Sequence, residues 1–146
     1  MTTLQEVIDI GSRERFLAVV STVRSDATVQ SSVVNAGVLT HPINGVEVVG
    51  FVTYGKAKLA NLRARPQLTI VVRAGWEWAA AEGPAELAGP SDPLPGLDAA
   101  ALPALLRAVF TAAGGTHDDW ATYDRVMAAE GRTAVLIEPS RVYSNP

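Results

Sequence analysis

The chain has 146 residues, 48% of them apolar, and a formal net charge of −3 at pH 7. This length and composition predict a single domain over residues 1–146 that buries a core of its own. The absence of cysteine excludes disulfide bonds, thiol catalysis and thiolate metal sites, and the acidic balance argues against general nucleic-acid binding. No apolar run reaches the ~18 residues of a membrane span and no signal peptide is recognised, so we expect a soluble, cytoplasmic protein.

The first half of the chain predicts two short helices and three strands. Thr3 and Glu6 have the spacing of a capping box, which predicts a helix over residues 4–10. Apolar and β-branched runs bounded by turn residues predict the strands 16–23, 28–39 and 46–53. The second helix follows the third strand and stops before Pro66, because the residue before a proline avoids helical geometry.

The second half of the chain adds further strands and two longer helices. We expect strands over residues 67–73, 76–81, 133–138 and 141–143, with the second of them able to continue past Pro84. Asp98 and Asp118 or Asp119 are candidate N-caps of helices over 99–113 and 120–130. Short turns join most strands, and the helices do not alternate with them. The pattern therefore predicts a mainly β fold, a small antiparallel barrel with peripheral helices.

Basic residues gather in the stretch 55–66, which reads GKAKLANLRARP. Lys56 and Lys58 are the only lysines of the chain, and Arg63 and Arg65 follow with no acid among them. A helix that starts near Lys56 directs its free N–H groups and the positive end of its dipole back toward the strand end, which favours an anion. The stretch predicts either a phosphate pocket or a short amphipathic helix with a solvated basic face.

No constellation of catalytic residues stands out. His41 precedes a proline in a turn, which favours a structural role. His117 lies at the start of a predicted helix, where Asp119 favours capping over metal binding. We therefore predict no metal site and assign no catalytic residue, and Tyr54 and Tyr143 are candidate proton donors that nothing in the sequence selects.

Trp76 and Trp78 alternate on a predicted strand and so share one face. Such aromatic pairs are usually core or dimer contacts, and contact with a ligand is the second interpretation. The residues by themselves leave both interpretations open.

Four segments, in their order and spacing, resemble one family. They are K-x-K-x-x-N-L-R-x-x-P at 56–66, W-x-W-A-x-A-E-G at 76–83, G-x-H-x-D-W-x-x-Y at 115–123 and R-V-Y at 141–143. With them, residues 15–146 resemble the split β-barrel flavin and deazaflavin oxidoreductases related to pyridoxamine 5′-phosphate oxidase, and more narrowly the subgroup that uses coenzyme F-420. The resemblance implies an antiparallel split β-barrel like that of FMN-binding proteins.

The resemblance also implies a homodimer with the cofactor bound between the subunits. The implied cofactor-binding residues are Lys56, Lys58, Asn61 and the backbone N–H of Ala57 for the phosphate, Gln30 and Ser32 for the ring system, and Trp76 and Trp78, from the other subunit, for the pocket wall. The subgroup often carries a polar residue at the place of Val33, and valine cannot make that hydrogen bond.

The implied reaction is hydride transfer between coenzyme F-420 and a small unsaturated organic substrate, with the cofactor supplying the chemistry. FMN is the alternative cofactor, because it has the same phosphate and a similar tricyclic ring. The Arg-x-His of pyridoxamine phosphate oxidases is missing near the C-terminus, where the chain reads R-V-Y-S-N-P, which disfavours that activity. A further alternative is a non-enzymatic barrel that stores a cofactor or binds single-stranded nucleic acid, although basic charge confined to one helix disfavours nucleic acid.

Overall fold

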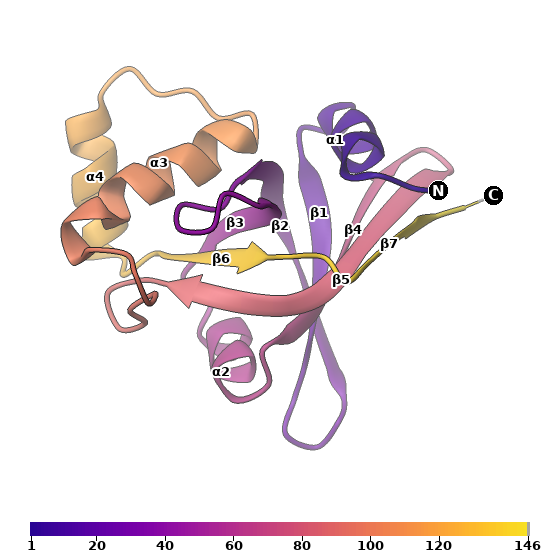
Figure 1. Ribbon diagram of the computed structural model, residues 1–146, viewed down its shortest axis with the longest axis horizontal. Coiled ribbons are helices and arrows are strands. Elements are labelled where there is room, and N and C mark those ends of the chain that lie inside the picture. The colour runs from indigo at the N-terminus through magenta and orange to yellow at the C-terminus, as the bar shows by residue number, and fades with distance from the viewer. Residues whose placement is uncertain (146) are drawn as a thin grey trace.

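Figure 1 shows the computed structural model of the chain, which describes residues 1–145. Six antiparallel strands close a barrel in the order β4-β1-β2-β3-β6-β5, with β5 pairing back to β4, and β7 adds to β5. The strands are β1 (Leu17–Val23), β2 (Val29–Thr40), β3 (Glu47–Thr53), β4 (Gln67–Ala74), β5 (Glu77–Ala88), β6 (Thr133–Ile137) and β7 (Arg141–Ser144). The helices are α1 (Leu4–Ser12), α2 (Lys56–Ala64), the 3-10 helix η1 (Ala99–Ala101), α3 (Leu102–Ala112) and α4 (Trp120–Ala129). The predicted mainly β barrel with peripheral helices is confirmed.

Strand β5 differs most from the expected elements. It pairs with β4 as far as Pro84 and then with β6 from Ala85 to Ala88. Proline has no N–H to donate, and it stands where the strand leaves one partner for the next, a position that tolerates proline. Trp76, expected as the first residue of this strand, instead lies in the preceding turn beside Gly75, whose φ is +61°.

The two ends of the barrel carry different helices, as Figure 1 shows. Helix α1 packs near the hairpin between β4 and β5, whereas α2 lies at the other end, beside the projecting β1–β2 hairpin. The capping box of α1 forms as predicted, because Thr3 Oγ1 accepts the Glu6 N–H at 3.3 Å and the Glu6 carboxylate accepts the Thr3 N–H at 2.8 Å. Residues of α2 therefore face a barrel end that α1 does not cover.

Two apolar cores lie on either side of the β3–β6 pair. One fills the barrel around Val20 and Phe51 and receives Leu62 from α2. The other lies between the outer face of the sheet and helices α3 and α4, around Leu106 and Leu136. Within residues 1–145, no helix is long and apolar enough to span a membrane.

The close approach of α3 to β2 depends on Gly37. A Cβ added at this position would lie 2.2 Å from the carbonyl oxygen of Ala112, the last residue of α3. Because the clash is with backbone, we expect Gly37→Ala to lower the free energy of unfolding by about 1–3 kcal/mol. Urea unfolding measures the loss, with Gly11→Ala, which meets only an ordinary contact at 3.4 Å, as the control. Equal midpoints for Gly37→Ala and the native chain would contradict this account of the packing.

Candidate functional site

Helix α2 begins directly after β3 and has no side-chain cap. Its N-cap residue is Gly55, and no side chain accepts the first N–H groups of the helix. These groups, with that of Ala57 among them, carry the positive end of the helix dipole. Gly55 is held in place by donating its own N–H to Thr53 Oγ1 at 3.2 Å. The start of α2 is thus built as an anion-favouring corner at the end of β3.

Lys58 projects from this helix start into the protein and is only 7% exposed. Its ammonium group donates to Thr53 Oγ1 at 3.3 Å and lies 5.7 Å from the centre of the Phe51 ring. An ammonium has three hydrogens, and no carboxylate of the described residues forms an ion pair with it. Burial lowers the pKa of Lys58 for the same reason, since no negative group offsets the desolvation of its charge.

The other basic residues of the stretch are differently placed. Arg63 forms a bidentate ion pair with Asp92, with N···O distances of 2.8 and 2.7 Å, which lowers the pKa of that carboxyl. The helical period predicts Arg65 on the face of Lys58, but α2 ends at Ala64 and Arg65 donates to the backbone oxygen of Val23 at 2.8 Å. The alternative of a helix with a solvated basic face is therefore wrong, because Lys58 is buried, Arg63 is paired and Arg65 lies beyond the helix. Lys58 and the exposed Lys56 remain for an anion.

Asn61 connects α2 to the strands through a residue that the sequence analysis did not identify. Its Nδ2 donates to the hydroxyl of Thr22 in β1 at 3.1 Å, and this hydroxyl donates to Gln30 Oε1 in β2 at 3.1 Å. Asn61 is 9% exposed and Thr22 is 1% exposed. The signal for Thr22 is weak, since it is one hydroxyl on the apolar inner face that Ala18 and Val20 share with it.

Ser32 lies on the same face of β2 as Gln30, opposite Val20. Its hydroxyl oxygen is buried and has no hydrogen-bond partner among the described residues, which is uncommon in a folded protein. Val33 points to the other side of the strand and is 63% exposed. The structure therefore brings Lys58, Asn61, Gln30 and Ser32 to one end of the barrel, where the ammonium has no carboxylate partner and the Ser32 hydroxyl has no hydrogen-bond partner among the described residues.

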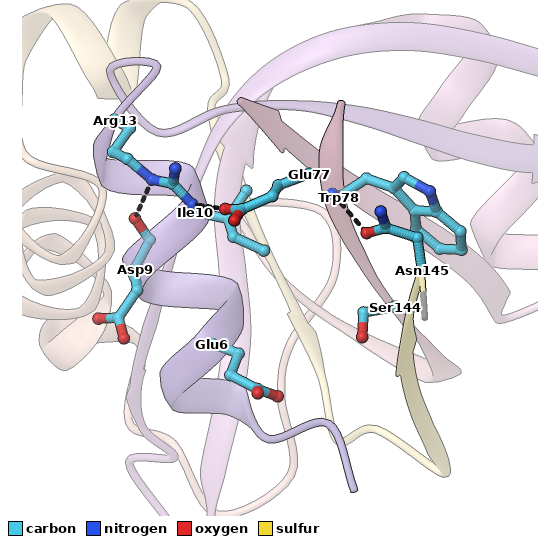
Figure 2. A pocket seen from close by; sticks show the side chains of 8 residues that line it. All are labelled: Glu6, Asp9, Ile10, Arg13, Glu77, Trp78, Ser144 and Asn145. Atoms are coloured by element: carbon cyan, nitrogen blue, oxygen red, sulfur yellow. Dashed lines mark hydrogen bonds and ion pairs between the residues drawn. The ribbon is translucent and has the colours of Figure 1, made fainter. Parts of the chain in front are cut away.

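The two tryptophans lie elsewhere. Trp76 is 94% exposed in the β4–β5 turn, and Trp78 lines a pocket with residues of α1. Figure 2 shows the pocket of ≈ 310 Å³ beside Trp78, which is lined by Glu6, Asp9, Ile10, Arg13, Glu77, Trp78, Ser144 and Asn145. Within one chain, these indoles do not meet the residues around α2. Their contribution from a second subunit stays a prediction.

The remaining titratable candidates have structural partners. His41 is 4% exposed, and its Nδ1 accepts the N–H groups of Ile43 and Asn44 while its Nε2 bonds Glu86 at 2.9 Å. Asp119 caps α4 by accepting the Thr122 N–H at 3.1 Å, as predicted.

The two tyrosines considered as proton donors are also engaged. The Tyr143 hydroxyl donates to Glu82 at 2.9 Å, which raises the pKa of the phenol. Tyr54 is 56% exposed, and the guanidinium of Arg132 lies 3.9 Å from the centre of its ring. Among residues 1–145, neither hydroxyl forms a hydrogen bond with Lys58 or Asn61. No group of three or more His, Asp or Glu arranged for a metal occurs in the same residues.

No protein-family model matches the chain. Among solved structures, it is similar to a conserved hypothetical protein of Mycobacterium tuberculosis, with a TM-score of 0.69, 18% identity and coverage of 99% of this chain and 84% of that one. A pyridoxamine 5′-phosphate oxidase-related, FMN-binding protein of Nostoc punctiforme gives a TM-score of 0.65, 14% identity and coverage of 96% and 82%. An F-420 reductase gives 0.56, 16% identity and coverage of 88% and 90%. At these identities the similarity shows the fold alone, an antiparallel barrel with peripheral helices that the FMN-binding protein of Nostoc punctiforme shares.

Proposed function

We propose that this protein is an oxidoreductase that binds coenzyme F-420 and transfers a hydride between the deazaflavin and a small unsaturated organic substrate. The observation that carries the proposal is the buried ammonium of Lys58, which has no carboxylate partner and stands beside uncapped N–H groups. A phosphate group would satisfy both, because it is an anion with several acceptor oxygens. The likeness of the fold to an FMN-binding protein and to an F-420 reductase supports a cofactor of this kind.

The residues present fit such a cofactor in two parts. Lys58, Lys56, Asn61 and the Ala57 N–H would hold the phosphate, while Gln30 and the unpartnered hydroxyl of Ser32 would hold the ring system. When bound, the deazaflavin would supply the hydride chemistry. The barrel residues would orient the ring and keep water from it, since the surrounding inner face is apolar.

We also propose that the protein acts as a homodimer that forms on the outer face of β1, β2 and β4. Val71, Val19 and Val33 form a row across these three strands, and Val19 and Val33 are 44% and 63% exposed. Leu17, which is 44% exposed, extends this row along β1. Val29, which is 58% exposed, lies on the same face beyond the hydrogen-bonded pair Ser21 and Ser31. Exposed apolar residues grouped on a sheet face favour burial against another protein surface, and a second copy offers the same face in a symmetric contact. Such a partner could bring its Trp76 and Trp78 to the α2 end of this subunit.

FMN is the second candidate cofactor, and the likeness to the FMN-binding barrel favours it. Parallel titrations of the purified protein with coenzyme F-420 and with FMN distinguish the two. We expect at least about tenfold tighter binding of coenzyme F-420, which corresponds to ~1.4 kcal/mol. A preference for FMN would replace the deazaflavin assignment with a flavin-dependent one. If neither binds at micromolar concentration, the proposal fails, and binding to single-stranded oligonucleotides would be measured as a function of salt.

A further inference from the structure

Thr22 stands at the centre of the hydrogen-bond chain that links Asn61 to Gln30. A hydroxyl has one hydrogen, so it donates once and accepts at its lone pairs. Here it accepts from Asn61 Nδ2 and donates to Gln30 Oε1, and both distances are 3.1 Å. The chain therefore runs in one direction, from Asn61 through Thr22 to Gln30.

This direction decides which end of the Gln30 amide is left for a ligand. The carbonyl oxygen is bound to Thr22, and the amino group has no hydrogen-bond partner within residues 1–145. If the Gln30 amide alone were turned over, two N–H groups would face the Thr22 oxygen, and its hydroxyl hydrogen would be buried without an acceptor. A buried donor without an acceptor is unfavourable, so the observed orientation is held by Thr22. If the amides of Asn61 and Gln30 were both turned over, Thr22 would donate to Asn61 and accept from Gln30, and the Gln30 oxygen would be left for a ligand. Substitutions of Gln30 distinguish the two arrangements.

We propose that Thr22 is a positioning residue that fixes Gln30 as a hydrogen-bond donor to the bound cofactor. This inference rests on the proposed function, and it specifies that Gln30 donates and the cofactor accepts. Beside the hydroxyl of Ser32, the Gln30 amino group recognises acceptor atoms of the ring system, such as the carbonyl oxygens that flavin and deazaflavin rings share. Thr22 acts only through Gln30, because it lies 1% exposed behind the two amides.

Two substitutions of Gln30 test whether its side chain donates a hydrogen bond to the cofactor. Gln30→Glu keeps the shape and can still accept from Thr22 but has no donor, and Gln30→Met removes both hydrogen-bonding ends. We expect each to weaken binding of coenzyme F-420 or FMN, whichever binds the native protein, by about fivefold or more, the loss for one hydrogen bond. Native affinity in Gln30→Glu together with weak binding in Gln30→Met would show that Gln30 accepts from the cofactor and would overturn the proposal. Native affinity in both would do the same.

Substitutions of Thr22 test its positioning role. Thr22→Val keeps the shape without the hydroxyl and should weaken cofactor binding about fivefold, whereas Thr22→Ser should restore it to within about twofold. Thr40→Val is the control, since Thr40 is an exposed strand threonine at the other end of β2, paired with Glu47. Native affinity in Thr22→Val, or equally weak binding in Thr22→Ser, would contradict the proposal.

A measurement on the cofactor-free protein separates this inference from the proposed function. The NMR signals of the Gln30 carboxamide should move in Thr22→Val and stay in place in Thr22→Ser and Thr40→Val. Unmoved signals in Thr22→Val would show that Thr22 does not hold Gln30, whatever cofactor binds. If the native protein binds neither cofactor, the proposed function fails, and these signals still decide whether Thr22 fixes the amide.

Discussion

Replacing Lys58 with alanine is expected to weaken cofactor binding by about 1.5–3 kcal/mol, which is about 10- to 150-fold in the dissociation constant. The reason is that the Lys58 ammonium is buried with one hydrogen bond, to Thr53, and has donors left for an anion. Isothermal titration of the native and variant proteins with coenzyme F-420, and with FMN, measures the loss. An unchanged affinity would refute the assignment of the phosphate to this helix start.

The control for this prediction is Arg63→Gln. It removes a positive charge from the same helix, but from a side chain that is 46% exposed and already paired with Asp92. We expect it to bind the cofactor nearly as tightly as the native protein, since exposed charges contribute little at physiological salt. A loss as large as that of Lys58→Ala would mean that the overall charge of α2, and not a specific contact, draws the anion.

The buried charge of Lys58 should lower the free energy of unfolding of the cofactor-free protein at neutral pH. Burial lowers the folded-state pKa of Lys58 below its usual 10.5, so the folded chain binds fewer protons than the unfolded chain between these two values. The contribution of Lys58 to stability therefore improves as the pH rises through that window and is least favourable below it. Lys58→Met, which buries no charge, should be more stable than the native protein at neutral pH and should lack this dependence. Urea unfolding at neutral and alkaline pH checks both.

Replacing Val33 with aspartate is expected to convert the proposed dimer to monomers. Val33 is the β2 member of the apolar row and its most exposed valine, and a two-fold contact through this face would bury both copies of the new carboxylate. Burying a charge without a partner costs several kcal/mol, so the dimer dissociation constant should rise by about 100-fold or more. Sedimentation equilibrium measures this constant. If the partner's tryptophans complete the site, the monomer should also bind the cofactor more weakly.

Two variants serve as controls for the dimer prediction. Val33→Thr keeps the β-branched shape without a charge and should dimerise nearly as well as the native chain. Val46→Asp places the same charge on a valine that is 41% exposed but lies before β3, outside the apolar face. It should therefore leave the dimer dissociation constant nearly unchanged. Dimers of native strength in Val33→Asp would show that the second subunit contacts another surface, or that the protein is monomeric.

Much of the fold could be predicted because its signals are local. The capping box at Thr3 and Glu6, the cap at Asp119 and the alternating strand residues act between neighbours in the chain. The prediction was wrong where contacts between distant parts of the chain determine the local structure. Trp76 alternates with Trp78 like a strand residue, yet the hairpin turn takes Trp76 out of β5.

By itself, the sequence determined an antiparallel barrel and an anion-favouring helix start after β3, because strand alternation and helix starts depend on residues a few positions apart. Only the tertiary structure decided which basic residues remain for an anion. Arg63 meets Asp92 across 29 positions, and Asn61 meets Thr22 across 39, once the barrel has closed. Burial of Lys58 likewise follows from packing α2 against the barrel end. Which charges are paired and which are desolvated depends on residues that come together only in the closed fold. Local sequence therefore cannot predict it.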